Sequence, residues 1–298
     1  MTRTLVTGGA GRLGRSVVAT LAASGRDVVS VDRLTADDLP AEQVELDLLD
    51  AAARHALFDR VRPAEVVHLA AIPVPFAAPE AELYAVNTAL AFGVLDDALR
   101  VGTRSLLAAS SPTTIGYGAP GGWTPAYLPL DEQHPTEPWN AYALSKLAVE
   151  ELMRMAARRE GDRIRVGSFR PCYVIAPEEW AGSPTQQGHT MAERLAHPEL
   201  SAVALFNYVD ARDAGDFVAA WLDHADAVPN GEVFFVGAPD ALVRGPVRDA
   251  IADHLPEAVA AAAGLGGDDP LFSSARAERL LGWHARRTWR TELAEVTE

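Results

Sequence analysis

The chain contains one cysteine in 298 residues, Cys172, so it can form neither an intrachain disulfide nor a cysteine-based metal cluster. It lacks any apolar run of about 20 residues that would span a bilayer, and its first residues show no apolar signal-peptide core. Basic residues are scarce, since 26 of them against 41 acidic ones give a formal net charge of -15. Such a charge repels phosphate backbones and anionic membrane surfaces. We expect a cytoplasmic protein that binds neither nucleic acid nor membranes and has no metal site.

A glycine-rich turn joins the first strand pattern to the first helical pattern. Residues 4–7 form a short β-type run, Gly8, Gly11 and Gly14 follow, and apolar residues then recur at helical spacing over 17–22. Glycines at these positions allow a tight turn and let a pyrophosphate approach backbone N–H groups at the start of a helix. The segment therefore predicts a dinucleotide site.

The second strand pattern, residues 28–32, ends in an acid placed 18 residues after Gly14. This acid, Asp32, could accept hydrogen bonds from both hydroxyls of an adenine ribose and would repel a 2′-phosphate. The position favours NAD over NADP. Arg33 follows immediately and could pair with a 2′-phosphate, so NADP stays possible.

Strand and helix patterns alternate as far as residue 169. Strand candidates at 44–48, 65–71, 105–111 and 163–169 are separated by helical stretches, among them 51–60 and 82–100. This alternation predicts an α/β protein with a Rossmann-type, doubly wound parallel sheet. Regularity drops afterwards, with short strand patterns at 203–206 and 233–236. We therefore predict a Rossmann domain over 1–170 and a smaller C-terminal substrate domain over 171–298, of which about 203–224 packs back on the Rossmann core.

Tyr142 and Lys146 stand four residues apart in a helical pattern and so lie on one face. A tyrosine with a pKa near 10 can exchange protons at neutral pH only if its phenolate is favoured, and a nearby ammonium can supply part of that effect. Asn87 lies beside an apolar helical stripe and must find hydrogen-bond partners. The strand candidate 105–111 ends in two hydroxyl residues, Ser110 and Ser111, and Thr113 and Thr114 follow, so four hydroxyl residues cluster at this strand end.

The motifs described above, in the order in which they occur, resemble those of the extended short-chain dehydrogenase/reductase family, also called the NAD-dependent epimerase/dehydratase family. The resemblance extends over nearly the whole chain. The motifs that carry the resemblance are the segment 7–14, Asp32, Asp47, the segment 68–71, Asn87, Ser110 and Ser111, Tyr142 with Lys146, and Arg170 with Pro171.

The resemblance implies that Tyr142 is the general acid/base. It also implies that Lys146 binds the nicotinamide ribose and lowers the tyrosine's pKa, that Asp47 contacts the adenine, that Asn87 supports the site, and that the protein is a homodimer. The cofactor contacts it implies are Gly8, Gly11, Arg12, Leu13, Gly14, Asp32, Arg33, Asp47, Leu48, Leu69, Ala70, Ala71, Asn87, Tyr142, Lys146, Pro171 and Tyr173.

The catalytic hydroxyl departs from the commonest family pattern. Counting back four residues from Tyr117 gives Thr113, whereas counting from the serine pair gives Ser111. The arrangement around the pair is similar to that in uronate dehydrogenases, so we favour Ser111 and keep Thr113 as the substitute. The substrate contacts expected are Ile72, Ser111, Thr113, Trp123, Tyr142 and Cys172, with Pro73, Tyr173 and Arg212 as further candidates.

Three reactions compete within this resemblance. Dehydratases of the family place an Asp-Glu pair after the catalytic hydroxyl, where this chain has Pro112 and Thr113, and nucleotide-sugar epimerases carry a Gly-Asp-Gly run that residues 204–210 replace. This favours an NAD-dependent oxidoreductase that acts on a sugar, uronate or related small hydroxyl or carbonyl compound. The alternatives are a UDP-sugar 4-epimerase with tightly held NAD and a non-catalytic NAD(P)-binding regulator. The regulator is disfavoured because Tyr142 and Lys146 are both present.

Overall fold

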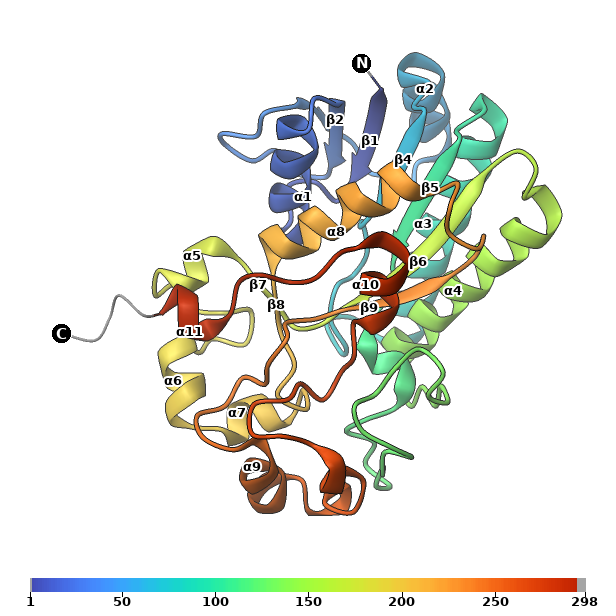
Figure 1. Ribbon diagram of the computed structural model, residues 1–298. Coiled ribbons are helices and arrows are strands. Elements are labelled where there is room, and N and C mark those ends of the chain that lie inside the picture. Colours follow the sequence, from blue (N-terminus) through green and yellow to red (C-terminus); the bar gives the residue numbers. More distant parts are fainter. Residues whose placement is uncertain (1, 294–298) are drawn as a thin grey trace.

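A parallel sheet of seven strands forms the centre of the computed structural model, which describes residues 2–293 (Figure 1). The strand order is β3-β2-β1-β4-β5-β6-β9, and every neighbouring pair is parallel. The strands are β1 (Arg3–Thr7), β2 (Asp27–Asp32), β3 (Glu42–Glu45), β4 (Glu65–His68), β5 (Ser105–Ala109), β6 (Arg165–Pro171) and β9 (Val233–Val236). The predicted Rossmann-type sheet is therefore confirmed.

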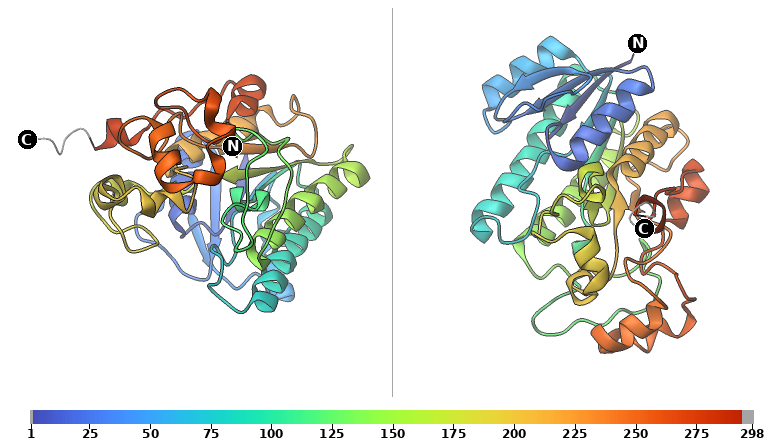
Figure 2. Two further views of the ribbon diagram at one scale, coloured as in Figure 1. Left: turned by 90° about the horizontal axis from the view of Figure 1, so that it is seen from below. Right: turned by 90° about the vertical axis from the view of Figure 1, so that its left-hand side faces the viewer.

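Helices cover both faces of this sheet. On one face, α1 (Arg12–Ala23) packs against α8 (Ala211–His224), and on the other face lie α2 (Ala51–Val61), α3 (Glu80–Val101) and α4 (Ala141–Glu160). Figure 2 shows the two helical layers on opposite sides of the strands. Most of the strands are thus buried on both sides, which explains their continuous apolar runs.

Alternating side chains of the strands feed two separate cores. Val6 and Val67 pack with Val17 and Phe217 on the α1 and α8 side. Leu5 and its neighbours face the opposite way, against side chains of α2, α3 and α4. This is the period of two that a strand imposes on its side chains.

Most of the C-terminal part lies beyond the carboxyl ends of the strands, in the lower half of Figure 1, whereas α10 (Ala275–Leu281) packs beside α8 and β9. A two-stranded parallel sheet, β7 (Val174–Ile175) with β8 (Val209–Asp210), links it to the Rossmann sheet. Its helices are α5 (Pro177–Trp180), α6 (Met191–Ala196), α7 (Glu199–Ala202), α9 (Val247–His254), α10 (Ala275–Leu281) and α11 (Trp289–Glu292). Short 3₁₀ turns occur at Pro112–Ile115 (η1), Pro256–Ala258 (η2) and Ala261–Gly264 (η3). A separate small core around Ile175, Trp180 and Tyr208 holds α5 and α6 in place.

Two expectations about the second half need correction. Residues 203–206 form a turn rather than a strand, because Leu205 and Phe206 both adopt positive φ angles of 52°, which a β-strand excludes. The strand at 233–236 does form, but it belongs to the main sheet beside β6, although these residues fall within the predicted smaller C-terminal domain. The chain therefore returns to the Rossmann core with both α8 and β9. Of the expected domain 171–298, the last five residues lie outside the described range.

Among residues 2–293, no helix is both long and apolar enough to cross a membrane. Within the same range, no group of three His, Cys, Asp or Glu side chains is arranged to hold a metal ion.

Candidate active site

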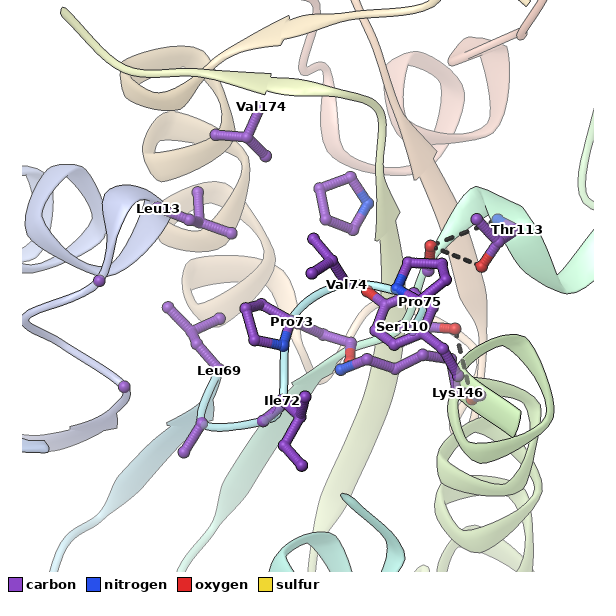
Figure 3. A pocket seen from close by; sticks show the side chains of 18 of the residues that line it. Leu13, Leu69, Ile72, Pro73, Val74, Pro75, Ser110, Thr113, Lys146 and Val174 are labelled. Atoms are coloured by element: carbon purple, nitrogen blue, oxygen red, sulfur yellow. Dashed lines mark hydrogen bonds between the residues drawn. The ribbon is translucent and has the colours of Figure 1, made fainter. Parts of the chain in front are cut away.

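A cavity of about 990 Å³ runs along the carboxyl edge of the sheet and continues beneath the C-terminal part. One end is lined by the glycine turn, Asp32 and Asp47, the middle by the segment 69–75, and the other end by Tyr142, Tyr173 and Asn207. Figure 3 shows Lys146 reaching from α4 toward the segment of Pro73 and Pro75, with Leu13 and Leu69 on the far side. Ligands of open α/β sheets bind at this edge.

The glycine turn is built for a close approach of backbone to ligand. Gly8 has a φ of +73°, and a Cβ there would lie 2.7 Å from the backbone nitrogen of Ala70. A Cβ on Gly14 would lie 2.1 Å from the carbonyl oxygen of Gly8. Gly11 is the N-cap of α1 and provides no side-chain cap, so the first N–H groups of this 12-residue helix remain available to an anion. This cradle fits the pyrophosphate of a dinucleotide.

Asp32 lies at the end of β2, at the position expected for an adenine-ribose contact. Its carboxylate accepts hydrogen bonds from the backbone nitrogens of Ala10 (3.2 Å) and Arg33 (2.7 Å). These bonds hold the acid against the glycine turn. Arg12, the first residue of α1, also lines the cavity, and its guanidinium is paired with the buried carboxylate of Glu179 on α5.

Tyr142 and Lys146 project from the first turns of α4, whose start is fixed by Asn140. The Asn140 side chain accepts a hydrogen bond from Ala143 N (2.9 Å) as an N-cap. The Lys146 ammonium donates to the carbonyl oxygen of Ala109 (3.0 Å) at the end of β5 and lies 5.8 Å from the centre of the Tyr142 ring. Both side chains line the cavity and are otherwise buried.

Burial sets the ionisation of this pair. It raises the pKa of Tyr142 to about 12, while interaction with the Ser111 hydroxyl acts in the opposite direction. Burial also lowers the pKa of Lys146 to about 8. The net effect of the protein environment is thus a raised pKa of Tyr142, and the expectation that Lys146 acts to lower it stays a prediction. In this environment the phenol is protonated at neutral pH and can donate its proton.

Of the two candidate catalytic hydroxyls, Ser111 interacts with Tyr142 and Thr113 contacts Ser111. Thr113 donates from its hydroxyl to Ser111 Oγ (2.9 Å), and its backbone nitrogen donates to the same oxygen (3.3 Å). Ser111 thus has its acceptor side occupied, which leaves its own proton for a bond to the phenol or to a substrate oxygen. Thr114, the last of the four clustered hydroxyls, lies outside the cavity and donates to Ser111 O.

Three buried polar groups support the site from behind. Asn87 exchanges two hydrogen bonds with the backbone of Ile72 (2.7 and 3.2 Å) and donates to Ser145 Oγ (3.1 Å), so it ties the segment that follows β4 to α4. His68 contacts the hydroxyl of Thr7 (2.8 Å), and burial lowers its pKa to about 3. Ser110 donates to Glu150 Oε1 (2.6 Å).

The structure brings most of the expected residues to this one cavity. Those that line it are Gly8, Gly11, Arg12, Leu13, Gly14, Asp32, Arg33, Asp47, Leu48, Leu69, Ala70, Ala71, Ile72, Pro73, Ser111, Thr113, Tyr142, Lys146, Pro171, Cys172 and Tyr173. Their roles remain predictions.

Three expected residues lie elsewhere. Trp123 packs edge-on against Tyr117 and does not line the cavity. Arg212 is held by Asp210, the N-cap of α8, and by Glu292. Asn87 is not among the lining residues, and its side chain is bonded to the backbone of Ile72; its expected cofactor contact stays a prediction.

Several lining residues are not among those expected, although Ala204 and Asn207 belong to the segment 204–210, which replaces the Gly-Asp-Gly run of epimerases. Gln186, Gln187, Val203, Ala204 and Asn207 come from loops of the C-terminal part and are brought to the cavity only by tertiary folding. Trp139 and Asn140 precede α4, and their position next to the Tyr142 helix could have identified them.

Comparison with known proteins assigns the class. Residues 4–237 match the NAD dependent epimerase/dehydratase family, and the chain belongs to that family.

The relatives with curated names include several UDP-glucose 4-epimerases. That of Mycolicibacterium smegmatis is 30% identical, over 99% of this chain and 97% of its own length. That of Azospirillum brasilense is 35% identical, but the match covers 54% of this chain and 46% of the relative. The chain thus spans about half the length of most of the curated relatives that it matches first.

Solved structures show the same fold over nearly the whole chain. A short-chain dehydrogenase/reductase superfamily protein from Agrobacterium tumefaciens, with bound NAD, has a TM-score of 0.72 and 26% identity, and the match covers 98% of this chain and 95% of that one. UDP-glucose 4-epimerase from Bifidobacterium longum, in complex with NAD+ and UDP, has a TM-score of 0.70 and 20% identity. The second likeness concerns the fold alone.

Proposed function

We propose that this protein is an NAD-dependent oxidoreductase that acts on a carbon bearing a hydroxyl or carbonyl group in a small sugar-like substrate. The observation that carries this proposal is the single cavity that joins the glycine cradle and Asp32 at one end to Tyr142, Ser111 and Lys146 at the other. NAD+, when bound, would take up the hydride from the substrate carbon and become NADH. The residues that would hold it are Gly8, Gly14, Asp32 and Lys146, and the solved relatives with bound NAD support this cofactor.

Tyr142 handles the proton in this proposal. When a substrate hydroxyl is oxidised to a carbonyl, Tyr142 must start as the phenolate: the substrate O–H bond breaks and the proton passes to the phenolate oxygen, which becomes the neutral phenol. In the reverse direction the phenol returns the proton to the carbonyl oxygen. Because burial raises the pKa of Tyr142 to about 12, the phenol is ready for the second direction at neutral pH. The Ser111 hydroxyl would donate to the same substrate oxygen and fix it beside Tyr142.

A UDP-sugar 4-epimerase is the second candidate. The match to the Mycolicibacterium smegmatis UDP-glucose 4-epimerase over nearly the full length of both chains favours it. Against it stands the charge of the cavity. Within residues 2–293, the lysine and arginine side chains that line the cavity are Arg12, Arg33 and Lys146, and Arg12 is already paired with Glu179. A nucleoside diphosphate carries at least two negative charges that need partners.

Absorbance at 340 nm separates the two candidates. Purified protein is mixed with NAD or NADP and with a panel of free sugars, sugar acids and UDP-sugars. Net formation of NADH with a free sugar or sugar acid supports the oxidoreductase. Interconversion of UDP-glucose and UDP-galactose without net absorbance change supports the epimerase and contradicts the first proposal.

We also propose a homodimer located in the cytoplasm. Helices α3 and α4 pack side by side and carry exposed large apolar side chains, Tyr84 and Phe92 on α3 and Leu144 on α4, which a second copy could cover. Light scattering of the purified protein in solution measures the oligomeric state directly, and a mass equal to one chain would contradict the homodimer.

A further inference from the structure

Arg194 on α6 differs from the other deeply buried arginines of the protein. Its side chain is 1% exposed, yet no carboxylate within residues 2–293 lies at ion-pair distance from it. Its Nε has no hydrogen-bond partner. By contrast, Arg54 is paired with Asp97 and Arg170 with Glu150. A buried guanidinium without a counter-charge is costly, since desolvation of the ion is not offset by an opposite charge.

The carboxylate whose charge acts on Arg194 is that of Glu179, and it is already engaged. Glu179 is paired with Arg12 and also accepts a hydrogen bond from Ala176 N (2.6 Å). The electrostatic consequence is visible in two arginines of the same region. Burial lowers the pKa of Arg194, whereas the Asp210 carboxylate raises that of Arg212. Arg194 therefore places a positive charge beneath the wall of the cavity that is only weakly compensated.

Arg194 acts on two side chains that line the cavity. Its guanidinium lies over the ring of Tyr173 (4.5 Å to the ring centre) and donates to the Tyr173 hydroxyl oxygen (3.3 Å). It also donates to Oε1 of Gln187 and to the carbonyl oxygen of Leu200 (2.9 Å). Tyr173 and Gln187 both line the cavity.

These contacts determine what the wall offers to a ligand. Arginine has five N–H donors and no acceptor, so it occupies the acceptor oxygens of Gln187 and Tyr173. The groups left for the cavity are the Gln187 amide N–H donors and the Tyr173 O–H. Two donors backed by one positive charge complement a group that only accepts hydrogen bonds and carries negative charge.

We propose that Arg194, acting through Gln187 and Tyr173, forms a subsite that recognises a single anionic substituent of the substrate, a carboxylate or a monophosphate. The proposal rests on the function proposed above, since it narrows the sugar-like substrate to an anionic one. One buried positive charge behind two hydrogen-bond donors thus faces one anionic group of the substrate. Arg194 is a positioning residue here, because Gln187 and Tyr173 lie between it and the cavity.

The test uses isothermal titration of the whole protein saturated with NADH, so that anions cannot occupy the glycine cradle. The ligands are glucuronate and galacturonate, the neutral sugars glucose and galactose, and glucose 6-phosphate. We expect the acid or the phosphate to bind at least about tenfold more tightly than its neutral parent, because hydrogen bonds to a charged group are worth that much. Selective binding of the sugar acids identifies a carboxylate as the recognised group, and selective binding of glucose 6-phosphate identifies a phosphate.

Gln187→Glu is the decisive variant. It places a carboxylate against Arg194, which neutralises the guanidinium and presents negative charge to the ligand. We expect the preference for the anionic ligand to fall at least about tenfold, binding of the neutral sugar to remain, and the melting temperature to rise. Ser183→Glu adds the same charge to the same loop, at an exposed residue outside the cavity, and is expected to leave the preference intact.

Equal binding of anionic and neutral ligands overturns the proposal, and so does an equal effect of Gln187→Glu and Ser183→Glu. Failure of this subsite proposal can be distinguished from failure of the proposed oxidoreductase function. Selective anion binding without any NADH formation would remove the oxidoreductase and keep the subsite. NADH formation with no preference for anionic substrates would do the reverse.

Discussion

A buried ion pair behind the catalytic residues gives a sharp stability prediction. Arg170 on β6 is 1% exposed and donates two hydrogen bonds to Glu150 on α4 (2.7 and 2.8 Å), whose side chain is fully buried. Ser110, next to the favoured catalytic Ser111, donates to Glu150 as well (2.6 Å). Glu150 therefore connects α4, β5 and β6, the three elements that position Tyr142 and Lys146.

The substitution Glu150→Gln preserves the shape of the side chain and removes its charge. It leaves the Arg170 guanidinium buried without a counter-ion, which costs about 3–5 kcal/mol. Taking roughly 2 °C per kcal/mol for a chain of this size, the melting temperature should fall by at least about 6 °C. Thermal unfolding followed by circular dichroism measures this change.

Glu151→Gln is the matched control. Glu151 is the next residue of the helix, its side chain is 57% exposed, and it pairs with Arg154 at the surface. A surface pair of this kind contributes at most about 1 kcal/mol, so the control should unfold close to the wild-type temperature. A double substitution of both members of the buried pair, Glu150→Leu with Arg170→Met, should recover most of the loss. Equal melting temperatures for Glu150→Gln and Glu151→Gln would refute the reasoning.

Three further predictions concern the glycine cradle and the buried bases. Gly14→Ala should weaken NAD binding at least about tenfold in a fluorescence titration because its Cβ would lie 2.1 Å from Gly8 O, whereas Gly264→Ala meets nothing within 4 Å and should be neutral. Lys146→Met should be more stable than the wild type by about 3 kcal/mol at pH 7, since the pKa of Lys146 is lowered from 10.5 to about 8. The cost of its buried charge is present below pH 8, so this gap should close as the pH rises from 8 to 10.5; a gap that does not change with pH in urea titrations would count against it. The pKa of His68 is lowered to about 3, so the wild type should lose stability as the pH falls through 6.5. Between pH 7 and pH 4.5 the free energy of unfolding of the wild type should fall by about 2–3 kcal/mol more than that of His68→Asn. Equal falls for the two proteins would contradict this prediction.

Local patterns were sufficient to predict the Rossmann half of the molecule. The run at 4–7, the glycines at 8, 11 and 14, and Asp32 lie within one strand-turn-helix-strand unit, where each position follows from its neighbours. The spacing of Tyr142 and Lys146 belongs to a single helix. The strand order itself comes from the structure, because doubly wound parallel sheets occur with more than one order.

The rest could not be derived from the sequence because it depends on contacts between distant segments. The apolar residues 203–206 have the composition of a strand, but the packing of Phe206 in the core forces a turn with positive φ angles. Trp123 is expected to contact the substrate because large aromatic side chains often line pockets, yet it packs against Tyr117 and His134. Gln187 and Arg194 lie in and after an irregular loop, and only the folded chain shows that one lines the cavity and the other is buried behind it.

The central claim is that Tyr142 transfers the proton in an NAD-dependent reaction. The most direct measurement compares wild type and Tyr142→Phe by NADH formation at 340 nm, with NAD affinity determined separately by titration. Phenylalanine retains the buried ring and removes the proton donor. We predict that turnover falls by at least about a hundredfold while NAD affinity stays within about threefold. Turnover near the wild-type rate in Tyr142→Phe would contradict the account.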